Sequence, residues 1–125
     1  MGLTRPKIFN IDTTLEYIND PIITINSNST QANTDVGFVF SRDGGTVSNV
    51  AVYWSESSNS LVTAFTSNNG ITDGNITASS YANLTTGGIT VNGNIMPSAN
   101  VTYDIGSSSY RFRTIYLSGS TINLG

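Results

Sequence analysis

The chain has 125 residues, a formal net charge of −3 and charged side chains at only 10% of its positions. It contains neither cysteine nor histidine, which excludes disulfides and thiolate chemistry and removes the commonest general base and zinc ligand. Five scattered basic residues argue against nucleic-acid binding, and no apolar run approaches the roughly 20 residues that would indicate membrane insertion.

Serine, threonine, asparagine and glycine are abundant, a mixture that favours strands and tight turns, whereas helix-forming residues are scarce. We therefore predict an all-β fold of short strands and turns. Apolar residues make up 38% of the chain, so one copy alone would form a thin core. Association of identical copies would add buried surface, because each copy covers an apolar face of its neighbour.

The first part of the chain begins with a polar leader at residues 1–7. Two or three short strands are predicted between residues 8 and 26, the last of them at Ile22-Ile23-Thr24-Ile25, with Asn19-Asp20-Pro21 as the break before it. The stretch at residues 26–34 is almost entirely polar and is predicted to be an exposed loop.

The strongest β signal lies at residues 36–66, where three apolar, aromatic-rich runs are joined by turn residues. This pattern predicts a meander or sandwich and, with the preceding strands, a compact β-lobe over residues 8–66. The two-residue period of a strand places alternate residues on one face. The predicted lobe core consists of Phe38, Phe40, Val52, Trp54 and Phe65.

Bulky residues become rare in residues 67–125, where short apolar pairs recur between glycines and asparagines. Residues 70–76 and 88–95 are near-repeats and predict short strands, each too poor in apolar surface to stand alone. For the run Tyr110–Leu117, a regular strand would put both arginines beside aliphatic side chains. A short helical turn leading into a strand is therefore favoured, and Gly106 is expected to adopt a backbone conformation closed to other residues.

Two segments carry a resemblance to a known family. Asp104-Ile105-Gly106-Ser107, followed by Tyr110-Arg111-Phe112-Arg113-Thr114-Ile115-Tyr116-Leu117, resembles a segment of tail fibre and other virion proteins of tailed bacteriophages. In those proteins it often precedes a self-cleaving carboxy-terminal chaperone domain. The stretches Phe9-Asn10-Ile11, Asp20–Asn26, Asp35–Phe38 and Tyr53–Ser57 resemble, more loosely, a module of marine phage structural proteins.

The resemblance implies a homotrimer in which residues 67–125 of three chains intertwine as a β-shaft or β-prism-like region. The implied trimer interface contains Ile105, Tyr110, Phe112, Ile115, Tyr116 and Leu117. It further implies a part made in the host cytoplasm and built into the virion, where it supports host attachment. The implied partners are sister copies and other virion proteins, and a host-surface glycan stays open as a further partner.

A glycan-binding adhesin is the main alternative, since aromatic rings can stack on sugars. Its candidate platform is Tyr53, Trp54, Tyr103, Tyr110 and Tyr116. Core or interface packing is the stronger interpretation, because these residues alternate within strand-like runs.

No enzymatic activity, cofactor or metal is predicted. The serines have no histidine partner, although Glu16, Glu56 and the aspartates leave a capsule depolymerase as the weakest alternative. Five aspartates are candidate calcium ligands but lack the spacing of a calcium loop, namely Asp12, Asp20, Asp35, Asp43 and Asp73. Asp43-Gly44-Gly45 and Asp73-Gly74-Asn75 are predicted to be turns instead.

Overall fold

The computed structural model describes residues 19–26, 30, 32–42, 48–69, 74–119 and 122–124. The predicted leader, the strands predicted before residue 19 and the turn predicted at residues 43–45 lie outside them. The chain divides into two compact units, Met1–Thr85 and Thr86–Gly125. The sequence suggested a boundary near residue 67. The first unit extends further because a strand beyond that point pairs with the preceding one.

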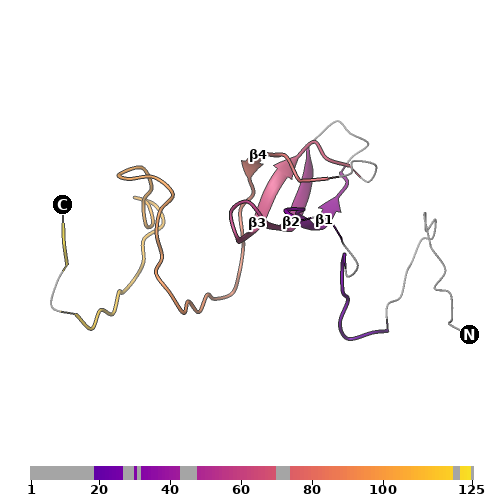
Figure 1. Cartoon of the computed structure of the whole chain (residues 1–125). Helices are drawn as coiled ribbons and strands as arrows, with labels where there is room; N and C mark the ends of the chain where they lie inside the picture. The colour runs from indigo at the N-terminus through magenta and orange to yellow at the C-terminus, as the bar shows by residue number, and fades with distance from the viewer. Residues whose placement is uncertain are drawn as a thin grey trace, which may run out of the picture. The chain divides into compact units, whose positions relative to one another are not determined.

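The first unit contains one antiparallel sheet, whose four strands follow one another in chain order (Figure 1). These are β1 (Val36–Phe40), β2 (Asn49–Ser55), β3 (Ser60–Thr66) and β4 (Ala78–Tyr81). The described residues contain no helix. The all-β prediction is therefore confirmed for this part of the chain, and so is the predicted meander of three strands.

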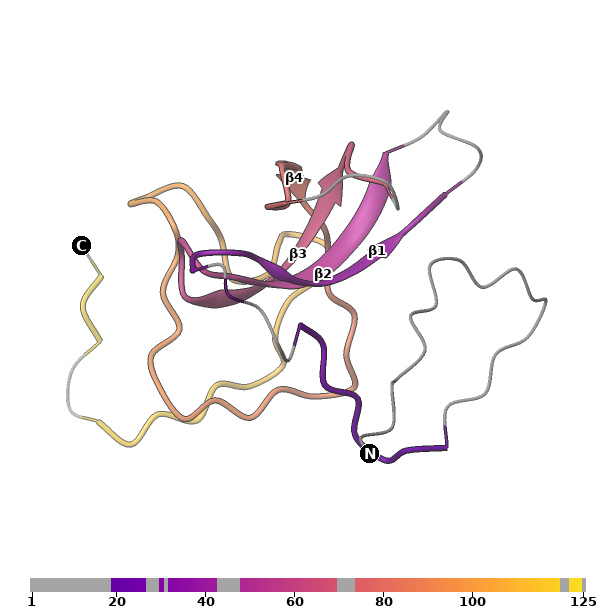
Figure 2. The same cartoon turned by 45° about the vertical axis from the view of Figure 1, so that its right-hand side comes forward.

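The hairpin of β2 and β3 is the best-paired part of the sheet and runs from Asn49 opposite Thr66 to Ser55 opposite Ser60. Its turn depends on Asn59, which has a φ of 48°, a left-handed conformation that asparagine tolerates better than most residues. The expectation that turn residues join these two apolar runs is thus confirmed. Figure 2 shows the same hairpin, with β1 alongside β2, from a second direction.

Strands β1 and β2 approach very closely at Gly37, which lies opposite Tyr53. A Cβ atom added at Gly37 would lie 2.3 Å from the carbonyl oxygen of Val52 and 2.4 Å from the Cα of Tyr53. Only glycine fits here without a shift of one strand.

Strand register gives the sheet two different faces. We call one the open face, with Val36, Phe38, Phe40, Val50, Val52, Trp54, Leu61, Thr63 and Phe65. The other, the covered face, contains Val39, Ala51, Tyr53, Val62 and Ala64. Alternate residues within each strand share a face, as predicted. The register also places these sets from β1, β2 and β3 on the same face of the sheet.

The core of the single chain lies on the covered face. Ala51 and Ala64 are fully buried, Tyr53 is 5% exposed, and Ile76 packs against them from beyond the sheet. The residues predicted to form the core lie instead on the open face, where Phe38 and Phe40 are 52% and 54% exposed. The reason is that the segment carrying Ile76 is fixed to the covered face by side-chain hydrogen bonds.

Asp35 provides the first part of this attachment. Its two carboxylate oxygens accept hydrogen bonds from the backbone N–H groups of Glu56, at 3.0 Å, and Ile76, at 3.1 Å. Its own backbone N–H donates to Oδ1 of Asn75 at 2.9 Å. One aspartate therefore joins the start of β1 to the β2–β3 turn and to the segment before β4.

Asn68 provides the second part and is itself 5% exposed. Its Oδ1 accepts a hydrogen bond from the backbone N–H of Thr77 at 2.9 Å, and its Nδ2 donates to the carbonyl oxygen of Asn75 at 3.2 Å. Its own carbonyl oxygen accepts a 2.7 Å hydrogen bond from Nδ2 of Asn49. Buried polar groups satisfied in this way hold one arrangement of the chain over the covered face.

Other predicted elements are not formed in the described residues. Residues 22–25 contain no strand, and residues 88–95 and 110–117 contain neither strand nor helix. All described residues of the second unit, 86–119 and 122–124, are exposed. A short strand needs a pairing partner, and the described part of this single chain supplies none to these segments.

Candidate assembly interface

A tight turn organises the part of the second unit that the sequence singled out. Gly106 has a φ of +83°, as expected, and a Cβ there would lie 2.9 Å from the carbonyl oxygen of Tyr110. The backbone N–H of Ser107 donates to that same oxygen at 2.8 Å, and the N–H of Tyr110 donates to Oγ of Ser107 at 3.0 Å. The glycine and serine therefore close the loop from residue 106 to residue 110.

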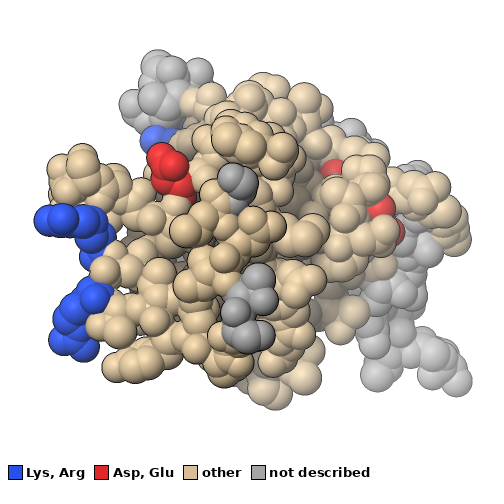
Figure 3. Space-filling view, turned by 90° about the vertical axis from the view of Figure 1, so that its left-hand side faces the viewer, with Lys and Arg blue, Asp and Glu red and all other residues tan. Residues whose placement is uncertain are grey.

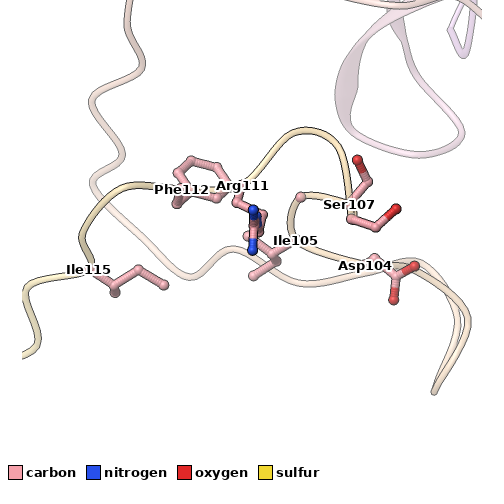
Figure 4. A pocket seen from close by; sticks show the side chains of 8 residues that line it. Asp104, Ile105, Ser107, Arg111, Phe112 and Ile115 are labelled. Atoms are coloured by element: carbon pink, nitrogen blue, oxygen red, sulfur yellow. The ribbon is translucent and has the colours of Figure 1, made fainter.

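This turn borders an open hollow of about 490 Å³ (Figure 4). Its lining combines apolar side chains, hydroxyls and two opposite charges, from Asp104, Ile105, Gly106, Ser107, Ser108, Arg111, Phe112 and Ile115. Both charged side chains line the hollow, and the carboxylate of Asp104 points away from Arg111 (Figure 4). The hollow therefore presents apolar, hydroxyl and charged groups on one concave surface.

All residues of the predicted trimer interface are exposed in the single chain. Tyr116 is 92% exposed, Tyr110 83% and Ile105 82%, and the others are Phe112, Ile115 and Leu117. The turn and the hollow bring Ile105, Phe112 and Ile115 together. Whether a neighbouring copy covers these residues stays a prediction.

Charged side chains are rare in the second unit, which carries only Asp104, Arg111 and Arg113. None of the three forms an ion pair with another described residue of the chain. Charged groups are likewise few on the side shown in Figure 3, where the described surface is mostly uncharged.

The open face of the sheet is a second apolar surface. Trp54 is 41% exposed and Leu61 72%, while Val52 and Phe65 are half-buried. Arg42 lies over the ring of Phe65, with its guanidinium carbon 5.8 Å from the ring centre. This contact covers one corner of the face and leaves Phe38, Trp54 and Leu61 open.

The aromatic residues proposed as a sugar platform are not all on one surface. Tyr53 and Trp54 are neighbours in β2 and therefore lie on opposite faces of the sheet. Tyr53 belongs to the core, where burial raises the pKa of its phenol above 10.0, with smaller contributions from Asp35 and Tyr81. Tyr53 therefore acts in packing.

Most of the candidate calcium ligands either bind backbone N–H groups or lie outside the described residues. Asp35 uses both carboxylate oxygens to hold backbone N–H groups, and Asp12, Asp43 and Asp73 lie outside the described residues. Within the described ranges, no three His, Cys, Asp or Glu side chains gather closely enough to hold a metal ion. In the same residues, no helix is long and apolar enough to cross a membrane.

The chain was compared with protein-family models, with curated proteins and with solved structures, and nothing matched it in any of the three comparisons.

Proposed function

We propose that this protein is a structural segment of a bacteriophage tail fibre or similar virion appendage and that it works as a homotrimer. The second unit of three chains, Thr86–Gly125, forms an intertwined β-shaft or β-prism-like region, and the sheet of the first unit, which includes β4, forms a more compact lobe. Its function is mechanical: three chains are held in register, and the fibre supports host attachment through contacts with other virion proteins. The proposal includes no enzymatic activity.

One observation supports this proposal most strongly: every described residue of the second unit is exposed. Ordering a residue costs roughly 1–2 kcal/mol of backbone entropy, which a lone chain offsets mainly by burying apolar groups. Here Ile105, Tyr110 and Tyr116 are all more than four-fifths exposed. Covering one such side chain contributes roughly 1.5–3 kcal/mol, so sister copies would supply the burial that one copy lacks.

The motif around the turn gives independent support. The resemblance to tail fibre proteins rests on Asp104–Ser107 and Tyr110–Leu117. The first of these stretches contains the left-handed Gly106, and the second supplies apolar side chains to the hollow. A segment built to be covered by other chains is expected to combine a rigid turn with exposed apolar groups.

Light scattering coupled to size exclusion tests the homotrimer. One chain has a mass of 13.3 kDa, so the proposal predicts a particle of about 40 kDa. Ile115→Asp should lower this mass, because a charge would enter the covered surface, whereas Ser98→Asp, at another exposed position, should leave it unchanged. A wild-type monomer, or equal behaviour of the two variants, would contradict the proposal.

Placement in a virion needs a separate experiment. Gold-labelled antibodies against the chain should mark tail appendages on phage particles that encode it. Labelling of capsids, or protein found only outside the particles, would refute this part of the proposal while leaving the trimer intact.

A glycan-binding adhesin remains the second candidate because Trp54 is 41% exposed on the open face. Glycan-array binding that disappears in Trp54→Ala, with the fold retained, would favour it. Tyr81→Ala is the matched control, since Tyr81 is an exposed aromatic residue outside the open face.

A further inference from the structure

Two of the three charged side chains of the second unit have an unusual setting. Asp104 and Arg111 both line the hollow beside Ile105, Phe112 and Ile115, and they are its only charged lining residues among those described. Neither pairs with a described residue of its own chain, and the Asp104 carboxylate points away from Arg111 (Figure 4). The single chain therefore presents one carboxylate and one guanidinium, separately, on the same apolar surface.

We propose that Asp104 of each copy forms an ion pair with Arg111 of the next copy, giving a closed ring of three identical contacts. This inference rests on the homotrimer proposed above. In a threefold ring each contact joins two different patches, so a carboxylate on one patch and a guanidinium on the other satisfy all three contacts at once. A guanidinium also matches a carboxylate with two parallel N–H···O hydrogen bonds.

Desolvation explains why the two charges must meet. If neighbouring copies cover Ile105, Phe112 and Ile115, the charges between them lose water as well. An unpaired charge in such a place is strongly destabilising, whereas a hydrogen-bonded pair is tolerated. The nearby sequence is rich in glycine, serine and asparagine and offers few shape-specific contacts, so the ion pair would fix the register of the three chains.

Arg113 is the matched control. It is exposed and carries the same charge as Arg111, two residues further along, but it does not line the hollow. Replacing it should change the net charge of the unit equally without removing the proposed contact.

The test uses charge reversal and mixing of full-length chains, with light scattering as the readout. Asp104→Arg and Arg111→Asp should each abolish the trimer, because every contact then joins like charges. A mixed trimer of the two variants has two opposite-charge contacts out of three, so co-expression should restore trimers that contain both chains. The double variant D104R/R111D should restore the trimer by itself, and Arg113→Asp should retain it.

The mixing experiment separates a contact between chains from one within a chain. If the double variant forms trimers but the mixture does not, the pair lies within each chain, and the inference is overturned while the homotrimer stands. Trimers of either single variant, or loss of trimers in Arg113→Asp alone, would also overturn it. A wild-type monomer would remove the proposed function first.

Neutral variants cover the case in which reversed charges prevent folding. Asp104→Asn and Arg111→Gln should each raise the concentration at which the trimer dissociates by at least roughly 1,000-fold, because each variant breaks a buried pair at all three contacts. The double neutral variant should be less impaired than the sum of both losses, because the two side chains share one interaction. Independent, additive losses would contradict the ion pair.

Discussion

Gly37→Ala is a sharp test of the sheet, because the position allows no side chain. The added methyl group would meet the Val52 carbonyl oxygen at 2.3 Å and the Tyr53 Cα and Cβ atoms at 2.4 and 2.5 Å. All three are well inside van der Waals contact, and two belong to the backbone of β2, which cannot rotate out of the way. Strand β1 must therefore move away from β2, which weakens the pairing of Gly37 with Tyr53.

Overpacking of this kind costs about 2 kcal/mol, within the usual range of 1–3. For a domain of this size each kcal/mol lowers the melting temperature by roughly 4–8 °C, so Gly37→Ala should lower it by roughly 8–16 °C. Circular dichroism during heating measures the shift, with all variants at one protein concentration because assembly makes melting concentration-dependent.

Gly93→Ala is the matched control, since a Cβ at Gly93 would have no neighbour within 4 Å. It should melt within about two degrees of the wild type, as expected for a surface substitution. If Gly37→Ala melts together with Gly93→Ala, the close approach of β1 and β2 does not exist and the register described above is refuted.

Three further predictions concern the core, the side-chain attachment and the turn. The raised pKa of Tyr53 means that the folded state favours the neutral phenol, so its stabilisation is complete below pH 10.0 and is lost as pH rises through the raised pKa. Urea unfolding should show that Tyr53→Phe loses less stability above pH 10.0 than Tyr103→Phe does, and equal losses would contradict the assignment. Asn68→Ala removes the side-chain groups that hold Thr77 and Asn75, and should cost about 2 kcal/mol in the same assay. The exposed Asn92→Ala should cost almost nothing, and comparable losses would show that the attachment is dispensable. Gly106→Ala combines a φ of +83° with a contact of 2.9 Å, so it should weaken trimer formation, whereas Gly119→Ala has open space and should not. Equal trimer dissociation in the two glycine variants would contradict a role for the turn.

The local sequence pattern predicted the first three strands because their apolar signal is strong. Apolar and aromatic residues fill the runs that became β1, β2 and β3, and turn residues such as Asn59 separate β2 from β3. Strand β4, by contrast, reads Ala-Ser-Ser-Tyr and carries almost no apolar signal. It forms through pairing with β3 and through contacts such as the 2.9 Å hydrogen bond from Ala82 N–H to the Thr63 carbonyl oxygen.

The choice of the buried face could not be predicted from periodicity. Strand β2 is apolar on both faces, with Val50, Val52 and Trp54 on one side and Ala51 and Tyr53 on the other. Size and hydrophobicity favour the first set, so two of its members, Val52 and Trp54, were predicted to belong to the core. The hydrogen bonds of Asp35 and Asn68 place residues 75–77 over the second set instead, and such long-range polar contacts leave no periodic signal.

For the candidate interface, the local sequence predicted more than it did for the buried face of the sheet. The motif identified the turn at Gly106 and the residues around the hollow, because glycine and serine at a sharp reversal carry local information. Asp104 was missed as a candidate contact residue, although its position as the only carboxylate of the second unit is visible in the sequence. The helical turn and strand predicted at residues 110–117 are absent from the single chain, where a strand would have no pairing partner among the described residues.

Thiol labelling tests most directly whether sister copies cover the second unit. The chain contains no cysteine, so a single introduced thiol reports on one position only. Both Ile115 and Ser98 are exposed in the single chain. In the assembled protein, Ile115→Cys should react far more slowly than Ser98→Cys, and dilution that dissociates the trimer should make the two rates equal. Equal rates before dilution, or slow labelling of Ile115→Cys in a monomer, would contradict the account.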